Sequence, residues 1–285
     1  VYTFLSHLLP PQERSVAELA ADLAAAAPGE PAQGSAAPQS SGESRTAKVL
    51  LELALAWIAA AQQSDFVGAR VLLEILHDQR PNDRFVIHQL ALATYKSEQP
   101  TPLDALKEAR EQLSPLRPET TNNPETLSLW GAIHRRMWDL EQRPEQLAEA
   151  VHAYSRSFYV KQDPYSGLNF AQLLELRALQ SARAGERDEA IADRVLARRV
   201  RQDILRYVAP QLDDLDELRA DKRYWMLASL WEVNAGLGRE ADASRWEQEG
   251  RAAAPSSAMV QTTEQHIART RETQAALDAT LAAAV

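Results

Sequence analysis

The stretch from Pro124 to Leu176 most constrains what this chain can fold into. It reads as a helix, a tight turn, a second helix, a break at Asp163-Pro164 and the opening of a third helix. The break is local, because a residue before proline is pushed out of the α-helical region. A helix hairpin followed directly by another hairpin is the unit of an α-solenoid, in which each unit packs only on its neighbours. The stretch therefore predicts a scaffold and no particular chemistry.

Similar pairs of helices recur along the chain. We predict pairs at residues 46–63 with 65–80, 84–97 with 103–113, 124–140 with 144–161, 167–184 with 186–207, and 224–237 with 240–254. In three pairs an alanine follows the turn residue at the same distance: Ser64 and Ala69, Gly185 and Ala190, Gly238 and Ala243. This offset is typical of the tetratricopeptide repeat, whose period is about 34 residues. The sequence predicts an all-α fold, an α-solenoid of about five tetratricopeptide-like helix pairs with flanking N- and C-terminal helices.

Composition supports the all-α class and excludes several functions. The chain is 45% hydrophobic and rich in Ala and Leu, which are strong helix formers. A net charge of −9 makes a nucleic-acid partner unexpected. No apolar run approaches the roughly 20 residues that span a bilayer, so we expect no membrane partner. The absence of cysteine excludes disulfides and thiolate chemistry and is consistent with a reducing compartment, so we expect a cytoplasmic protein.

The repeats are expected to occupy only part of the chain. We predict an N-terminal segment and helix at 1–27, a flexible linker at 28–45, the repeat domain at 46–255 and a C-terminal capping helix at 256–285. The linker is rich in Pro, Gly and Ser, which cannot bury a core. The chain begins at Val1 without a signal peptide, so we expect a fragment whose residues 1–27 are the tail of an upstream domain.

Three runs in the middle of the chain, PETLSLWGAIHRR, AEAVHAYSRSF and DPYSGLNFAQLL, resemble the TRAF-binding domain family. That family occurs in the apoptosis-signal-regulating kinase kinase kinases of animals and in uncharacterised bacterial proteins. The resemblance covers residues 46–255 and implies a helical-repeat regulatory region that binds partner proteins. No kinase motif is present, so no kinase activity is implied. The Ala- and Arg-rich composition indicates a bacterial source, so the family name does not identify the partner.

One junction in these runs is the most specific part of the resemblance. It consists of Tyr165, Gly167, Leu168 and Asn169. We expect it to set the angle between the third and fourth pairs, with Gly167 allowing close approach and Asn169 capping backbone groups. Its role is expected to be structural.

No catalytic or metal-binding constellation is found in the sequence. The six histidines form no His-Glu-x-x-His motif and no i,i+4 pair. The acidic cluster around Asp213 lacks the alternating ligands and glycine of a calcium loop. Neither a phosphate-binding loop nor a Gly-x-Ser-x-Gly elbow occurs. We therefore expect no enzyme, no cofactor and no metal. The arginine-rich face of residues 186–207 is expected to be solvated, because acidic residues are interleaved with the arginines.

A binding groove is the remaining functional expectation. In such a superhelix the first helix of each pair lines the concave face. By repeat position the exposed residues there are Phe85, His88, Tyr95, Lys96, Glu125, Ser128, Arg135, Arg136, Gln172, Glu175, Arg183, Trp225 and Glu232. We expect a protein or peptide partner, which could be the chain's own upstream domain. The alternative is a small-molecule, nucleotide-like sensing domain, with Arg135, Arg136 and Trp225 as contacts.

Overall fold

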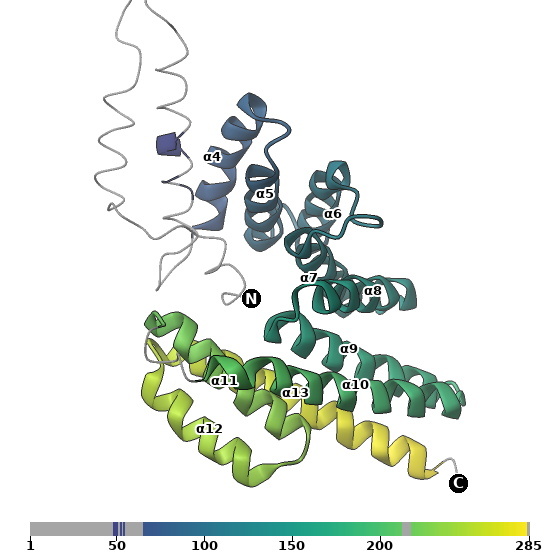
Figure 1. The fold of residues 1–285 in the computed structure, drawn as a ribbon. Helices are drawn as coiled ribbons and strands as arrows, with labels where there is room; N and C mark the ends of the chain where they lie inside the picture. The colour runs from purple at the N-terminus through teal and green to yellow at the C-terminus, as the bar shows by residue number, and fades with distance from the viewer. Residues whose placement is uncertain (1–47, 51, 53, 55–64, 213–217, 284–285) are drawn as a thin grey trace, which may run out of the picture. The chain divides into compact units, whose positions relative to one another are not determined.

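The computed structural model describes residues 48–50, 52, 54, 65–212 and 218–283, and these residues form helices and turns without a strand. The helices are α4 (Phe66–Gln79), α5 (Arg84–Ser97), α6 (Pro102–Leu113), η1 (Ser114–Leu116), α7 (Pro124–Glu141), α8 (Pro144–Lys161), α9 (Pro164–Arg183), α10 (Arg187–Val208), η2 (Ala209–Gln211), α11 (Ala220–Gly236), α12 (Glu240–Ala253) and α13 (Ser257–Ala283) (Figure 1). The predicted fold class, an all-α solenoid of tetratricopeptide-like helix pairs, is confirmed.

Several predicted features lie outside the described residues. They are the segment 1–27, the linker 28–45, most of the helix 46–63, and the acidic cluster around Asp213. The described residues divide into two compact units. One ends at Thr121 and contains α4, α5 and α6, and the other starts at Asn122 and contains α7 to α13. The predicted domain boundaries at 27, 45 and 255 stay predictions.

Side-chain caps fix where five of these helices begin. Asp65, Asp83, Thr101, Asn123 and Asp163 each accept a hydrogen bond from a backbone N–H in the first turn of the helix that follows. α6, α7, α8 and α9 also have proline at the first helical position, where a backbone N–H has no intrahelical partner to lose. The short connections between consecutive helices make each pair antiparallel.

The start of α9 differs from the prediction. We expected the fourth pair to begin at Gly167, but α9 begins at Pro164. Asp163 Oδ1 accepts a hydrogen bond from the backbone N–H of Ser166 at 3.0 Å. The proline that ends α8 therefore also starts the next helix, so the connection is a single short turn and the two helices pack closely.

The unit that ends at Thr121 is held by packing of α5 between α4 and α6. α4 buries Ala69, Leu73 and Leu76. Arg70 of α4 joins the outer helices, because its Nη2 lies 2.7 Å from Glu108 Oε1 of α6 while its Nε bonds Glu74. Desolvation lowers the pKa of Arg70, but its two carboxylate partners outweigh that effect and the pKa is raised.

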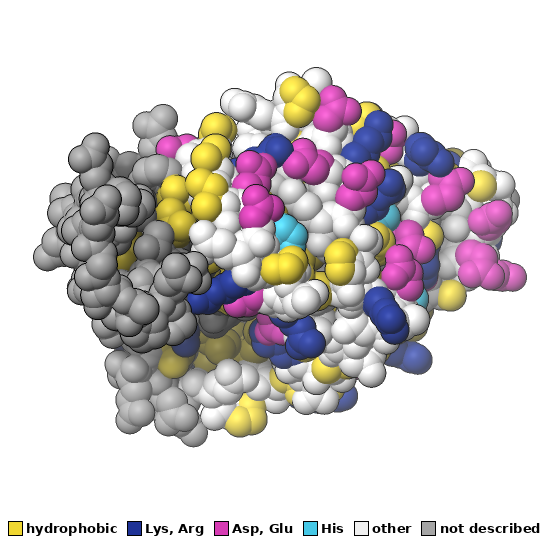
Figure 2. Space-filling view, turned by 90° about the horizontal axis from the view of Figure 1, so that it is seen from above, with side chains coloured by type: hydrophobic (Ala, Val, Ile, Leu, Met, Phe, Trp, Pro, Cys, Tyr) yellow, Lys and Arg dark blue, Asp and Glu magenta, His cyan; other side chains and the backbone are white. Residues whose placement is uncertain are grey.

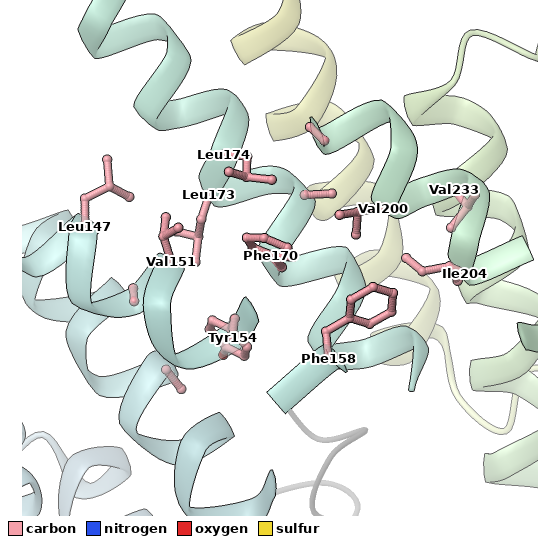
Figure 3. Packing of buried hydrophobic residues seen from close by; sticks show 14 of the residues in the cluster. Leu147, Val151, Tyr154, Phe158, Phe170, Leu173, Leu174, Val200, Ile204 and Val233 are labelled. Carbon is pink, nitrogen blue, oxygen red and sulfur yellow. The ribbon is translucent and has the colours of Figure 1, made fainter. Parts of the chain in front are cut away.

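The core of the second unit is built around large side chains from α8, α9 and α10. Tyr154, Phe158, Phe170 and Ile204 are almost completely buried, together with aliphatic residues of the same helices (Figure 3). Gly167 lies where these helices meet, and a Cβ there would be 2.8 Å from Ile204 Cδ1 and from Phe158 Cε2. The expectation that Gly167 allows close approach agrees with this geometry.

The last helix, α13, is 27 residues long and packs against α9 and α11, the first helices of the last two pairs (Figure 1). Val260 and Ile267 join a cluster with Tyr224, Trp225 and other residues of α11 and α12. Further along, Leu277 and Leu281 join a cluster with residues of α9 and α10. α13 therefore covers the side of the unit on which the sequence predicted a groove.

The glycine at the α8–α9–α10 contact gives a stability test. Gly167→Ala should lower the free energy of unfolding by about 1–3 kcal/mol, because the added methyl overpacks a filled core. Gly250→Ala is the matched control, since its Cβ would lie 3.8 Å from Leu227 Cβ, an ordinary contact. That change should be neutral or stabilise by up to about 1 kcal/mol through helix propensity. Urea unfolding followed by circular dichroism measures both, and equal effects would contradict the role of Gly167.

Candidate functional site: the inner face of the C-terminal unit

We use the term inner face for the surface that α7, α9 and α11 present towards α13. Its centre is an ion pair between Glu175 of α9 and Arg201 of α10, both about 3% exposed. Arg201 Nη1 and Nη2 donate to the two carboxylate oxygens of Glu175 at 2.5 and 2.7 Å. Gln274 of α13 donates from Nε2 to Glu175 Oε1 at 2.7 Å and to the carbonyl oxygen of Gly236 at 2.9 Å. One carboxylate therefore connects α9, α10 and α13.

This pair corrects two expectations. Glu175 was expected to be exposed in the groove, and Arg201 was expected to lie on a solvated arginine face. Each is 2% exposed as a whole residue. Each residue can be buried because the other neutralises its charge. A charged side chain is buried only where an opposite charge and hydrogen bonds take the place of the lost water. The partners are 26 residues apart, beyond the reach of a local pattern.

A second polar cluster surrounds Arg135 of α7. Its Nη1 donates to Gln172 Oε1 at 2.5 Å and to Asn169 Oδ1 at 3.3 Å, both on α9. Burial lowers the pKa of Arg135; Asp139 one turn further along opposes this shift, and Arg269 of α13 adds to it. Both acceptors of Arg135 Nη1 are neutral amide oxygens. A partly buried cation whose hydrogen-bond acceptors are neutral favours an anion, and this is the chemistry that the cluster offers.

The junction residues lie beside this cluster. The Tyr165 hydroxyl is 3.3 Å from the hydroxyl of Tyr154, and burial raises the pKa of Tyr165 well above its usual value. Asn169 was expected to cap backbone groups, and this was wrong. It lies inside α9, donates to the carbonyl oxygen of Tyr165 at 2.9 Å and accepts from Arg135, while Asp163 caps the helix. Leu168 packs partly buried against the core.

Four predicted groove residues belong to the other unit. His88 and Tyr95 are each 3% exposed, so the expectation that they are exposed was wrong, whereas Phe85 and Lys96 are partly exposed. The helix α5 that carries them packs between two neighbours and buries residues on every side. These four residues therefore belong to a different unit from Arg135 and Glu175.

The remaining predicted groove residues lie in the C-terminal unit. Trp225 is 9% exposed and stacks edge-on against Tyr224 at 4.9 Å, so it is a core residue and the expectation that it is exposed was wrong. Glu232 Oε2 faces His266 Nδ1 of α13 at 3.5 Å. Arg136 is partly buried, and Arg183 is exposed at the end of α9.

Between α9, α11 and α13 there is a cavity of about 20 Å³, lined among others by Asn169, Gln172, Glu232 and His266. This volume is enough for about one water molecule. With α13 in place, this cavity therefore has no room for an organic ligand. Sequence reasoning missed Arg201 and Gln274, and no sequence signal could have paired them with Glu175, because 99 residues separate Gln274 from its acceptor.

Charges of both signs are interspersed on the face seen in Figure 2, without a continuous basic area among the residues drawn in colour. Within the described part of the chain, no group of three or more His, Cys, Asp or Glu side chains is placed to hold a metal ion. The described helices also include none long and apolar enough to cross a membrane.

These antiparallel pairs with capped, closely packed helices define a helical-repeat protein of the tetratricopeptide type. The family model "Tetratricopeptide Repeats-Sensor" (TPR-S) matches residues 65–174, which run from the N-cap of α4 into α9. Among solved structures, a thermophilic TPR protein from Thermus thermophilus is similar, with a TM-score of 0.49 and 16% identity over 79% of this chain and 98% of that chain. Comparison with curated proteins gives no match.

The buried ion pair makes a stability prediction. Glu175→Gln should destabilise the chain by about 3–5 kcal/mol, because it leaves Arg201 charged and unpaired in the interior. The double variant Glu175→Leu with Arg201→Met should lose less than the single variant, since it removes both charges. Asp203→Asn, which breaks the exposed pair with Arg206, is the control and should cost less than about 1 kcal/mol. Chemical unfolding of the three proteins measures these differences; a single variant as stable as the control would disprove the role of the pair.

Proposed function

We propose that this chain is a non-enzymatic regulatory module that binds a protein or peptide partner through the inner face of its C-terminal unit. The observation that supports it best is that this face already binds a helix, because α13 packs along α9 and α11. Repeat surfaces of this kind recognise amphipathic helices through spaced apolar anchors. The TRAF-binding resemblance of residues 46–255 agrees with a regulatory role, and we place the module in the cytoplasm of a bacterium.

The way α13 is held favours exchange with a partner. Its large buried aliphatic residues are only four, Val260, Ile267, Leu277 and Leu281. Many of its other contacts are ion pairs at the surface, among them Arg194–Asp278, Arg271–Glu240 and Arg251–Glu264. Exposed ion pairs contribute about 0–1 kcal/mol each and weaken with salt. A partner helix with better anchors would therefore displace α13 and occupy the same face.

Weakening α13 in the intact chain tests this proposal. The double variant Leu277→Asp, Leu281→Asp should release the end of α13 and expose its site on α9. A fluorescent peptide of residues 257–283 should then bind the variant saturably and the wild type hardly at all, as measured by anisotropy. The same peptide carrying both aspartates is the control and should bind neither.

Two results would contradict the proposal. A variant that keeps its helical circular dichroism but binds no peptide would show that α13 is not a separable ligand. Affinity purification with chemical cross-linking should also recover a protein cross-linked to α9 or α11, more from the variant than from the wild type. Recovery of no protein by either form would exclude partner binding as the function.

The second candidate function is sensing of a small anionic, nucleotide-like molecule. The observation that favours it is the Arg135 cluster, in which burial lowers the pKa of a guanidinium that bonds only amide oxygens in the described residues. Arg269 of α13 adds a second positive charge nearby. The adjacent cavity of about 20 Å³ is too small for a nucleotide, so this function requires α13 to move and predicts that ligand and α13 compete. Trp225 is buried and is not one of its contacts.

A thermal-shift panel of nucleotides tests this candidate. A true ligand should raise the melting temperature of the wild type, and Arg135→Gln should abolish the shift because it removes the charged donor. Arg183→Gln, at an exposed arginine on the end of α9, is the control and should keep the shift. A flat response across the panel, or equal loss in both variants, would exclude the Arg135 cluster as a nucleotide site.

A further inference from the structure

A cleft of about 360 Å³ lies where α10, the turn after α11 and the second half of α13 meet. It is distinct from the cavity of about 20 Å³, although Arg201 lines both. The pair Glu175–Arg201 and Gln274 line the cleft, and Val195, Leu237 and Leu277 are apolar residues of its lining. The volume falls at the lower end of the range for small-molecule sites, which combine an apolar wall with a few fixed polar groups.

The charges around this cleft are unbalanced. Three arginines of α10 line it, Arg194, Arg198 and Arg201, against two acidic groups, Glu175 and Asp278. Both acidic groups already have partners. Arg201 donates to both oxygens of Glu175, and Arg194 Nη2 lies 2.6 Å from Asp278 Oδ1.

Arg198 is the charged residue of the cleft lining that is left after these pairs are counted. It is exposed at the cleft and has no ion-pair partner among the described residues. The cleft is therefore locally positive in a chain of net charge −9. An acidic protein repels anions from most of its surface. A positively charged cleft in such a protein is therefore a place where an anion is attracted.

We propose that this cleft binds a small organic anion, a phosphate monoester or a di- or tricarboxylate. The charged head of the ligand bonds Arg198, and its organic part lies against Val195, Leu237 and Leu277. Arginine suits this role because its planar fork donates two parallel hydrogen bonds to a carboxylate or phosphate. The site requires α13 to be docked, because α13 supplies part of its lining, but it does not require a partner at the inner face.

The position of the cleft gives such a ligand a structural effect. α10 supplies the arginines, whereas α13 supplies Gln274, Leu277 and Asp278. A ligand in the cleft therefore contacts both helices. Because it binds only when α13 is docked, its binding stabilises the docked arrangement. The anion would oppose the release of α13, and its absence would favour it.

Isothermal titration of the whole chain with citrate and with glycerol 3-phosphate at low salt tests the site. Either anion should bind saturably, and glycerol should not. Arg198→Gln should weaken binding by about tenfold or more, since loss of one charge-assisted hydrogen bond is worth about that factor. Arg199→Gln is the matched control, because Arg199 is the next residue of the same helix, is also exposed and does not line the cleft.

The outcomes separate the proposal from a general effect of surface charge. Saturable binding of citrate alone identifies a carboxylate site and binding of glycerol 3-phosphate alone a phosphate site, and each supports the proposal if Arg198→Gln reduces it. Binding of neither anion overturns the proposal, and so does an equal loss in Arg199→Gln. Circular dichroism should show both variants as folded as the wild type, because both side chains are exposed. Failure of the peptide exchange experiment would leave this result unchanged.

Discussion

The buried pair of Glu175 and Arg201 is the interaction on which the C-terminal unit depends. It joins α9 to α10, and through Gln274 it fixes α13. Gly236 of α11 completes the arrangement, because a Cβ at this position would lie only 2.4 Å from Arg201 Nε. Such a pair contributes little net stability compared with apolar residues of the same volume, since both charges lose their water. The pair instead fixes the relative position of the helices, because any other packing that separates the two residues leaves a charge unpaired in the interior.

That geometric constraint explains how a polar helix can have a single docked position. α13 offers few large apolar anchors, and many of its residues are Ala, Thr or charged. Apolar contacts alone would allow it to slide along α9. Gln274 removes that freedom, because its amide donates at once to Glu175 and to the carbonyl oxygen of Gly236. A partner that replaces α13 on this face would have to supply a donor at the same point, and this requirement is a source of specificity.

The helices themselves could be predicted from local patterns. α7 starts at Pro124 as predicted, and α6 starts at Pro102, one residue before the predicted start, because caps and N1 prolines act within one turn. The burial of individual side chains on the first helix of each pair could not be predicted from such local patterns. Trp225 and Glu175 lie at repeat positions where we expected exposed residues, but Trp225 packs in a cluster with residues of α13, and Glu175 bonds Arg201 and Gln274. Arg201 and Arg198 lie three residues apart on one helix, yet only Arg201 has an acidic partner among the described residues.

The sequence by itself determined the class of fold, the helix pairs and several of the residues that begin and end them. These properties depend on interactions between residues a few positions apart, which leave periodic and capping signals. Only the tertiary structure decided which polar side chains are buried together and that the last helix lies on the inner face. Glu175, Arg201 and Gln274 meet across 26 and 99 residues of chain. No local signal marks them, because the free energy of each depends on partners that only folding brings into contact.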